Sequence, residues 1–155
     1  MYVFDTSSLR VLRNYYPETF PSFWGLFDGL VNDGQVISVR EVRNELRRQV
    51  TKGWLSDWVK EHGDLFPIPS PQETIFVREI FAVPHFQSLI SEQQRLKGYP
   101  VADPFVIAAA RAKDATVVTE ELFKPNAAKI PNVCQHFNVE WLDLEMFMAF
   151  NAWRF

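Results

Sequence analysis

The chain has 155 residues, of which 47% are hydrophobic, with 14 Phe, 5 Trp and a net charge of −3. A chain of this length and composition is expected to fold as one globular domain, residues 1–155, and the composition excludes a disordered chain. The only cysteine, Cys134, excludes an internal disulfide and a cysteine-based zinc site, and it fits a reducing, cytoplasmic setting.

The amino-terminal part of the chain predicts a strand followed by two helices. Tyr2-Val3-Phe4 is a short apolar run, which predicts a buried strand that ends at Asp5. A helix is expected to begin over Thr6 to Arg13, and Phe20 to Val31 is expected to form another. The apolar face of this second helix is expected to comprise Phe23, Leu26, Phe27 and Leu30.

A turn, a strand and the clearest amphipathic helix follow. Asp33-Gly34 predicts a turn into a second strand at Val36-Ile37. The next helix is expected to run from Ser38 to Lys52 and to end at Gly53. Its apolar residues recur at intervals of three and four, which is typical of one buried helix face. They are Val39, Val42, Leu46 and Val50.

Residues 54–100 are predicted to be largely helical, and we interpret them as a helical arm of the same domain. Gly98-Tyr99-Pro100 closes the segment, because glycine and proline end helices. Prolines also interrupt it at Pro67, Pro69, Pro71 and Pro84.

The last third of the chain completes the alternation of strands and helices. Pro104 to Lys113 is apolar nearly all round, which predicts a helix packed on more than one side. Thr116 to Thr119 is expected to be a buried strand, Asn132 to Val139 a last strand, and Leu142 to Trp153 a closing helix. Short apolar strands separated by helices predict an α/β fold with a parallel sheet.

Acidic side chains follow two of the predicted strands. Asp5 comes directly after the first strand, and Glu120 and Glu121 come directly after Thr119. Parallel sheets place their ligand sites outside the carboxyl ends of the strands, and hard divalent cations prefer oxygen ligands. The pattern therefore predicts the start of a metal site, without choosing between Glu120 and Glu121.

Asp103 and Asp5 each have a second interpretation as helix caps. Asp103 precedes Pro104, and Asp followed by Pro at the first helical position is a strong helix start. Asp5 precedes the hydroxyl residues Thr6, Ser7 and Ser8 at the start of a predicted helix. Capping and metal binding are compatible roles.

Two glutamates lie on the helix from Ser38, and helix geometry separates them. Ser38 and Glu41 match the S-x-x-E capping box, which explains Glu41 without any catalytic role. At 100° per residue, Glu45 lies about 105° from the centre of the apolar face and Glu41 about 145°, so Glu41 is expected to face water. Glu45 is therefore the better site candidate. The alternative is a surface glutamate paired with Arg48 or Gln49.

Arginines crowd the same part of the sequence. A charge run of this kind usually forms a solvated face, but it is also the feature that would draw nucleic-acid phosphates to a chain whose net charge is −3. The candidates for contact with such phosphates are Arg10, Arg40, Arg43, Arg47 and Arg48.

Four segments together resemble the motifs of PIN domains. Val3 to Ser8 is similar to the opening motif, in which an apolar strand runs into Asp with small hydroxyl residues after it. Ser38 to Leu46 resembles the second motif, which has a Glu-Leu pair within a helix. Ala102 to Ala110 resembles the third, an Asp that heads an alanine-rich helix, and Val117 to Glu121 resembles the fourth, an acid two positions after Thr. The fourth acid is usually Asp in that family, and the stretch between the second and third motifs is longer here than in compact members.

This resemblance implies a three-layer α/β/α sandwich with a central parallel sheet and a Mg²⁺- or Mn²⁺-dependent ribonuclease site. The implied site comprises Asp5, Glu45, Asp103 and Glu121, with Asp5 and Asp103 as the principal ligands. The second choices are Glu120, Glu41, Thr6 and Thr119. Many small bacterial members are VapC-type toxins that hydrolyse RNA, are held inactive by a cognate antitoxin protein and are often homodimeric.

Two other functions stay open at this point. The first is an inactive PIN scaffold that serves as a protein or RNA interaction module, with the acids only capping helices. The second is a phosphotransfer domain with Asp5 as nucleophile, which is disfavoured because Ser7 stands where a second Asp would be expected.

A membrane location is not expected. No window approaches the roughly 20 apolar residues that a bilayer span requires. The opening residues also lack a basic lead and a cleavage signal, so we expect a cytoplasmic protein.

Overall fold

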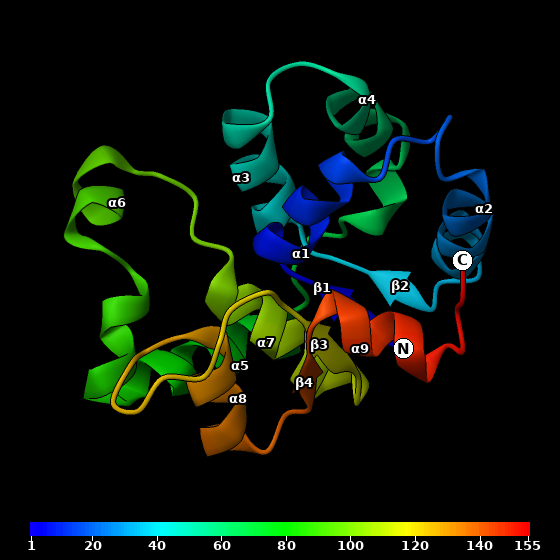
Figure 1. Ribbon diagram of the computed structural model, residues 1–155. Coiled ribbons are helices and arrows are strands. Elements are labelled where there is room, and N and C mark those ends of the chain that lie inside the picture. The colour runs from blue at the N-terminus through cyan, green and yellow to red at the C-terminus, as the bar shows by residue number, and fades with distance from the viewer.

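Four short parallel strands form the centre of the protein in a computed structural model that describes residues 1–155 (Figure 1). The strands are β1 (Tyr2–Phe4), β2 (Val36–Ile37), β3 (Thr116–Val118) and β4 (Trp141–Leu142). Their order is β2-β1-β3-β4, and the register pairs Val3 with Ile37 on one side and with Val117 on the other. Because every strand runs in the same direction, all four end at one edge of the sheet.

One face of the sheet is covered by aromatic side chains from two helices. Phe4 on β1 is fully buried, and its ring packs edge-on against Phe27 of α2 (Pro21–Asn32) and Phe147 of α9 (Leu144–Phe150). The ring centroids lie 5.4 and 5.0 Å apart, within the range of favourable aromatic pairs. This cluster fixes both helices on the same side of the sheet.

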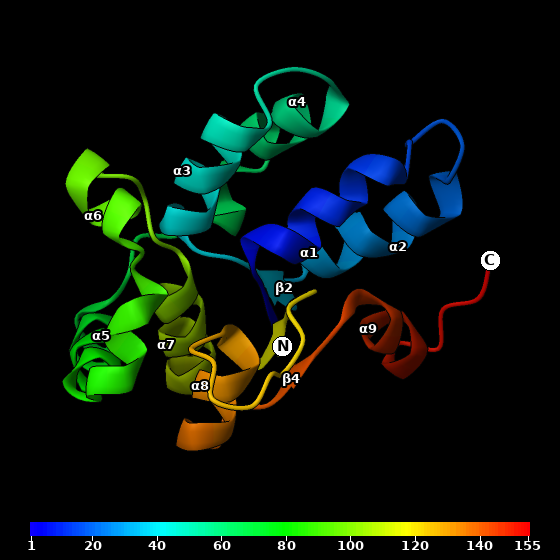
Figure 2. The ribbon, with the colours of Figure 1, turned by 60° about the vertical axis from the view of Figure 1, so that its left-hand side comes forward.

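The opposite face is covered by α7 (Asp103–Lys113), which packs against β1 and β3. The alanines of α7 let it lie close to the sheet, and α5 (Pro71–Ala82) and α8 (Ile130–Phe137) pack against its far side. Figure 2 shows α5, α7 and α8 on one side of the strands and α1, α2 and α9 on the other. The predicted three-layer α/β/α sandwich is therefore confirmed, as is the prediction that α7 is packed on more than one side.

The remaining helical segments near the amino-terminus surround the carboxyl edge of β1. They are α1 (Thr6–Val11), η1 (Leu12–Asn14), α3 (Arg40–Gln49), α4 (Trp54–Glu61) and η2 (Gly63–Leu65). α3 buries Val42 and Leu46, two members of the predicted apolar face, and it packs against α1. The helix ends at Gln49 and not at Lys52, so it is shorter than predicted. Gly53, which was expected to end this helix, has a φ of 93° and directly precedes α4.

The protruding arm is much shorter than the predicted arm of residues 54–100. α4 and α5 both pack into the body, with Leu55 and Ile80 among the most buried side chains. The projecting part is α6 (Glu92–Lys97) with the residues that flank it, whereas η3 (Pro84–Leu89) buries Phe86 and Leu89 in the core. α6 buries none of its residues and stands away from the body in Figure 1.

Two predictions about individual elements were wrong. The strand expected over 132–139 is part of α8, where Ile130, Val133 and Cys134 are buried at helical spacing. The last strand is instead Trp141–Leu142, between α8 and α9. Leu26, expected on the apolar face of α2, is 46% exposed, because Trp24 turns toward the core in its place.

None of the helices combines the length and the apolar character that a membrane crossing requires.

Candidate active site

Asp5 lies at the end of β1 and is 3% exposed. Its Oδ1 accepts a hydrogen bond from the Ser8 amide at 2.7 Å, so it caps α1 as the alternative interpretation proposed. Oδ2 accepts from the hydroxyls of Ser7 and Thr119, each at 2.7 Å. These donors come from two neighbouring strand ends, and they hold the carboxylate at the point where the strands stop.

Glu45 reaches this edge of the sheet from α3. Its Oε2 accepts from the Thr6 hydroxyl at 2.5 Å, and its Oε1 accepts from the Ala102 amide at 3.1 Å. Burial raises the pKa of Glu45, while the two hydrogen bonds act in the opposite direction. Glu45 makes no ion pair with Arg48, so the interpretation as a paired surface glutamate is wrong.

Asp103 is the first residue of α7 and makes no capping hydrogen bond, which excludes the interpretation of this residue as a helix cap. Burial, followed by the negative charges of Glu121, Glu45 and Asp5, raises the pKa of Asp103 to about 8. The Glu45 carboxylate bonds to Thr6 and Ala102, the residues next to Asp5 and Asp103, and the Glu121 amide bonds to the Thr119 hydroxyl, which also bonds Asp5. The four acids therefore lie near the carboxyl edge of the sheet.

The two acids after β3 point in different directions. Glu121 contributes the largest of the three charge effects on Asp103, and its Oε2 accepts from the Ile130 amide at 2.9 Å at the start of α8. Glu120 is exposed and instead accepts from the Leu144 amide at 2.9 Å at the start of α9. Of the pair, Glu121 is the member that lies with the other acids.

Residues 2–155 match the family described as Domain of unknown function (DUF4411). The chain belongs to this family. Among solved structures, it is similar to a chain in the crystal structure of VapBC2 from Rickettsia felis bound to a DNA fragment from their promoter. The TM-score is 0.51 and the identity 17%, over 92% of this chain and 97% of that chain. At this identity the likeness concerns the fold alone. No curated protein matches.

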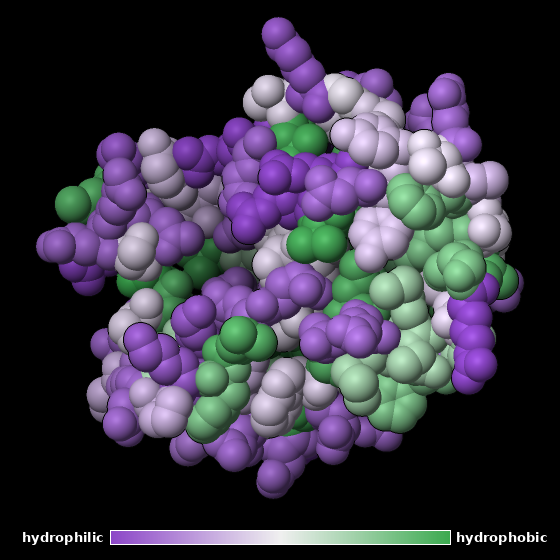
Figure 3. All heavy atoms as spheres, in the orientation of Figure 1, coloured by the Kyte–Doolittle hydropathy of each residue, from purple (hydrophilic) through white to green (hydrophobic).

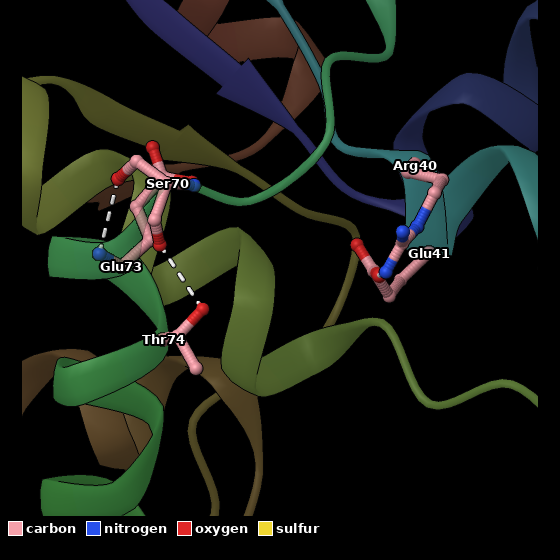
Figure 4. Close-up of polar contacts among 5 residues, drawn as sticks. All are labelled: Arg40, Glu41, Ser70, Glu73 and Thr74. Carbon is pink, nitrogen blue, oxygen red and sulfur yellow. Dashed lines mark hydrogen bonds and ion pairs between the residues drawn. The ribbon is translucent and has the colours of Figure 1, made fainter.

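Glu41 of this DUF4411 protein does not face water, contrary to the prediction from helix geometry. It is 6% exposed and pairs with Arg40 at 2.6 Å, as Figure 4 shows. The Ser38 hydroxyl does not cap α3 but donates to the Phe4 carbonyl at 2.7 Å, and α3 begins after Val39 without a side-chain cap. Capping boxes occur instead at the start of α5, where Ser70 and Glu73 exchange hydrogen bonds, and at the start of α6, with Ser91 and Gln94.

Sequence reasoning missed the hydroxyl network that supports the acids. Thr6 and Thr119, which were only second choices for the site, bond to Glu45 and Asp5. Ser7, which was not considered, bonds to both oxygens of Asp5 and also accepts from the Glu120 amide at 3.0 Å. The run of three hydroxyl residues after Asp5 was the available signal.

The donor chemistry of this DUF4411 site fits a hard divalent cation, since every charged donor is a carboxylate oxygen. The excess negative charge that raises the pKa of Asp103 is the kind that a bound cation relieves. No three acidic, thiol or imidazole side chains stand at the spacing of a formed metal site. Glu45 and Glu121, which are held by backbone amides, are the side chains that would have to turn.

Proposed function

We propose that this protein is a PIN-type, Mg²⁺- or Mn²⁺-dependent endoribonuclease that hydrolyses RNA phosphodiester bonds. The observation that carries the proposal is the placement of Asp5, Glu45, Asp103 and Glu121 near one edge of the sheet, through the hydrogen bonds that Thr6, Ala102 and Thr119 make there. Four acids from separate segments, gathered at the carboxyl edge of a parallel sheet, are unfavourable for stability, and such perturbed groups cluster at functional sites. Local capping explains the position of Asp5 but not that of Asp103.

The residues divide into ligands and supports. Asp5 and Asp103 are the principal cation ligands, and Glu45 and Glu121 complete the set after leaving their amide donors. Thr6 and Thr119 keep the carboxylates oriented through their hydroxyls. A bound cation supplies a hydroxide-like water near neutral pH and offsets the charge that grows on the phosphate.

The partner that we propose is a cognate antitoxin protein, with homodimerisation as in many VapC-type toxins. The support is the structure of VapBC2, in which two partners occur with promoter DNA, and whose fold this chain shares. A neighbouring small reading frame that encodes an antitoxin would strengthen this part of the proposal.

A second candidate function is an interaction module without catalysis. It is favoured by the hydrogen bonds that occupy the acids, since Asp5 caps α1 and Glu121 bonds the first amide of α8. In that case the acids need no cation, and the cleft would bind protein or RNA only.

A Mn²⁺ titration by calorimetry, together with an RNA cleavage assay with and without EDTA, separates the two. We expect binding and EDTA-sensitive cleavage for the wild type. Asp5→Asn should lose both, and Glu145→Gln, an exposed acid on α9, should lose neither. If the wild type and Asp5→Asn bind Mn²⁺ equally weakly and neither cleaves RNA, the nuclease proposal fails and the interaction module stands.

A further inference from the structure

A cavity of about 250 Å³ opens directly beside the acidic cluster. It is lined by Glu45, Arg48, Gln49, Gln94, Tyr99 and Pro100. Glu45 belongs both to this cavity and to the carboxylate site. A ligand in the cavity would therefore lie next to the carboxylates at the strand ends.

Three cations that form no ion pair lie in or beside this cavity. The guanidinium of Arg48 lies 3.4 Å from the ring centroid of Tyr99, and the Lys97 ammonium lies 5.6 Å from the same centroid. Arg10 donates to the side chain of Gln49 at 3.0 Å, and its charge acts on Glu45. The positive charges of Arg48 and Lys97 are thus available to an anionic ligand, and that of Arg10 is shared with Glu45.

The other arginines of α3 do not share this arrangement. Arg40 pairs with Glu41, and Arg43 lies over the ring of Phe66 and beside Gly63, away from the cavity. Arg47, the immediate neighbour of Arg48, lines a different cavity. Of the four arginines on α3, Arg48 alone lines the cavity that includes Glu45.

The combination of unpaired cations with an aromatic ring is the chemistry that recognises single-stranded nucleic acid. Cations take the backbone phosphates, and an aromatic face stacks a base without regard to its identity. Gln49 and Gln94 add amides that can bond to a base edge or a sugar hydroxyl. Figure 3 shows hydrophilic side chains gathered over the arm and over α1 and α3, and of these elements the arm and α3 line the cavity.

We propose that Arg48 and Tyr99, with Arg10 and Lys97 beside them, bind the nucleotide that flanks the scissile phosphate of a single-stranded RNA. This inference rests on the proposed nuclease function and deepens it. It also gives the arm a role, because Lys97 ends α6 and Tyr99 follows it. The arm thereby supplies one wall of the substrate channel, and α3 supplies the other.

The test uses two arginines that stand side by side on one helix. Arg48→Ala and Arg47→Ala remove the same charge, but only Arg48 lines the cavity. Binding of a short, unstructured, fluorescein-labelled RNA is measured by anisotropy in the Asp103→Asn background, so that the strand stays intact, at several KCl concentrations. Arg48→Ala should weaken binding about tenfold and lower the slope of log K against log salt by about 0.7, while Arg47→Ala should change the affinity less than about twofold. Tyr99→Ala should weaken binding about fivefold or more, and Tyr99→Phe should retain it.

Cleavage kinetics of the single variants, in which Asp103 is retained, separate this inference from the proposed nuclease function. Arg48→Ala should raise KM about tenfold with kcat changed little, because the residue binds the substrate and does not touch the reacting atoms. If the wild type cleaves RNA but Arg48→Ala and Arg47→Ala behave alike, the subsite is refuted and the nuclease function stands. If the wild type neither binds nor cleaves RNA, both are refuted.

Discussion

Replacing Asp103 by Asn should stabilise the protein in the absence of metal. The ordinary pKa of an Asp is 3.8, and the value for Asp103 is about 8. At pH 7 this difference costs the folded state about 4 kcal/mol, since one pKa unit corresponds to about 1.4 kcal/mol. An Asn amide that is buried without hydrogen-bond partners destabilises the folded state by about 1–3 kcal/mol, which offsets part of the gain. The expected net gain is therefore about 1–3 kcal/mol, or roughly 3–10 °C in melting temperature for a chain of this size.

The gain should depend on pH in a defined direction. Because the pKa of Asp103 is higher in the folded state than in the unfolded state, its contribution to stability is complete below about pH 4 and is lost as the pH rises to about 8. The Asn variant has no such loss. The variant should therefore be no more stable than the wild type at pH 4, and its advantage should grow up to pH 8 and then stay constant.

The assay is urea unfolding in EDTA at several pH values. Asp114→Asn is the matched control, because Asp114 ends the same helix, is exposed and has a φ of 50° that Asn tolerates. Its effect should stay below about 1 kcal/mol. A clear loss of stability in Asp103→Asn at pH 7, or a gain that does not vary with pH, would refute the idea of a crowded anionic site.

Three further predictions concern the supports of the site and the core. Thr119→Val removes the hydroxyl that bonds Asp5 and should cost about 1–3 kcal/mol in urea unfolding, with at least a tenfold loss of Mn²⁺ affinity by calorimetry. Phe147→Ala should cost about 3–5 kcal/mol in thermal unfolding, whereas Phe150→Ala on the same helix, 68% exposed, should cost less than about 1 kcal/mol. Ser38→Ala should lose about 1–2 kcal/mol in urea unfolding, because the buried carbonyl at the end of β1 loses its donor; an unchanged midpoint would show that another donor replaces the hydroxyl.

The fold was largely predictable because its elements are local patterns. Short apolar runs gave β1, β2 and β3, and the apolar spacing on α3 gave the face that is buried. β4 was missed because Leu142 was assigned to the closing helix and both Trp141 and Leu142 are only half-buried, unlike Val36 of β2. The extent of the arm was overestimated, since tertiary packing, and not local sequence, decides whether a helix such as α5 lies on the body.

The sequence indicated which strand and helix ends carry the acids, but not what each acid bonds. Strand ends and helix angle selected Asp5 and Glu45, whose carboxylates accept from Thr119 and from Thr6 and Ala102. The choice between Glu120 and Glu121 depended on the direction of the chain after β3, which short-range spacing does not encode. The role of Tyr99 was also hidden, because its stacking on Arg48 joins residues about 50 positions apart in the sequence.

The hydrogen bond from the Ala102 amide to Glu45 gives the arm a thermodynamic connection to the carboxylates. Ala102 is where the chain returns from the arm to α7. A ligand that draws Oε1 of Glu45 away from this amide loosens the returning end of the arm, and an arm held more tightly to the body makes that oxygen harder to withdraw. By reciprocity, substitutions at the base of the arm should shift cation affinity as much as the cation shifts the anchoring of the arm.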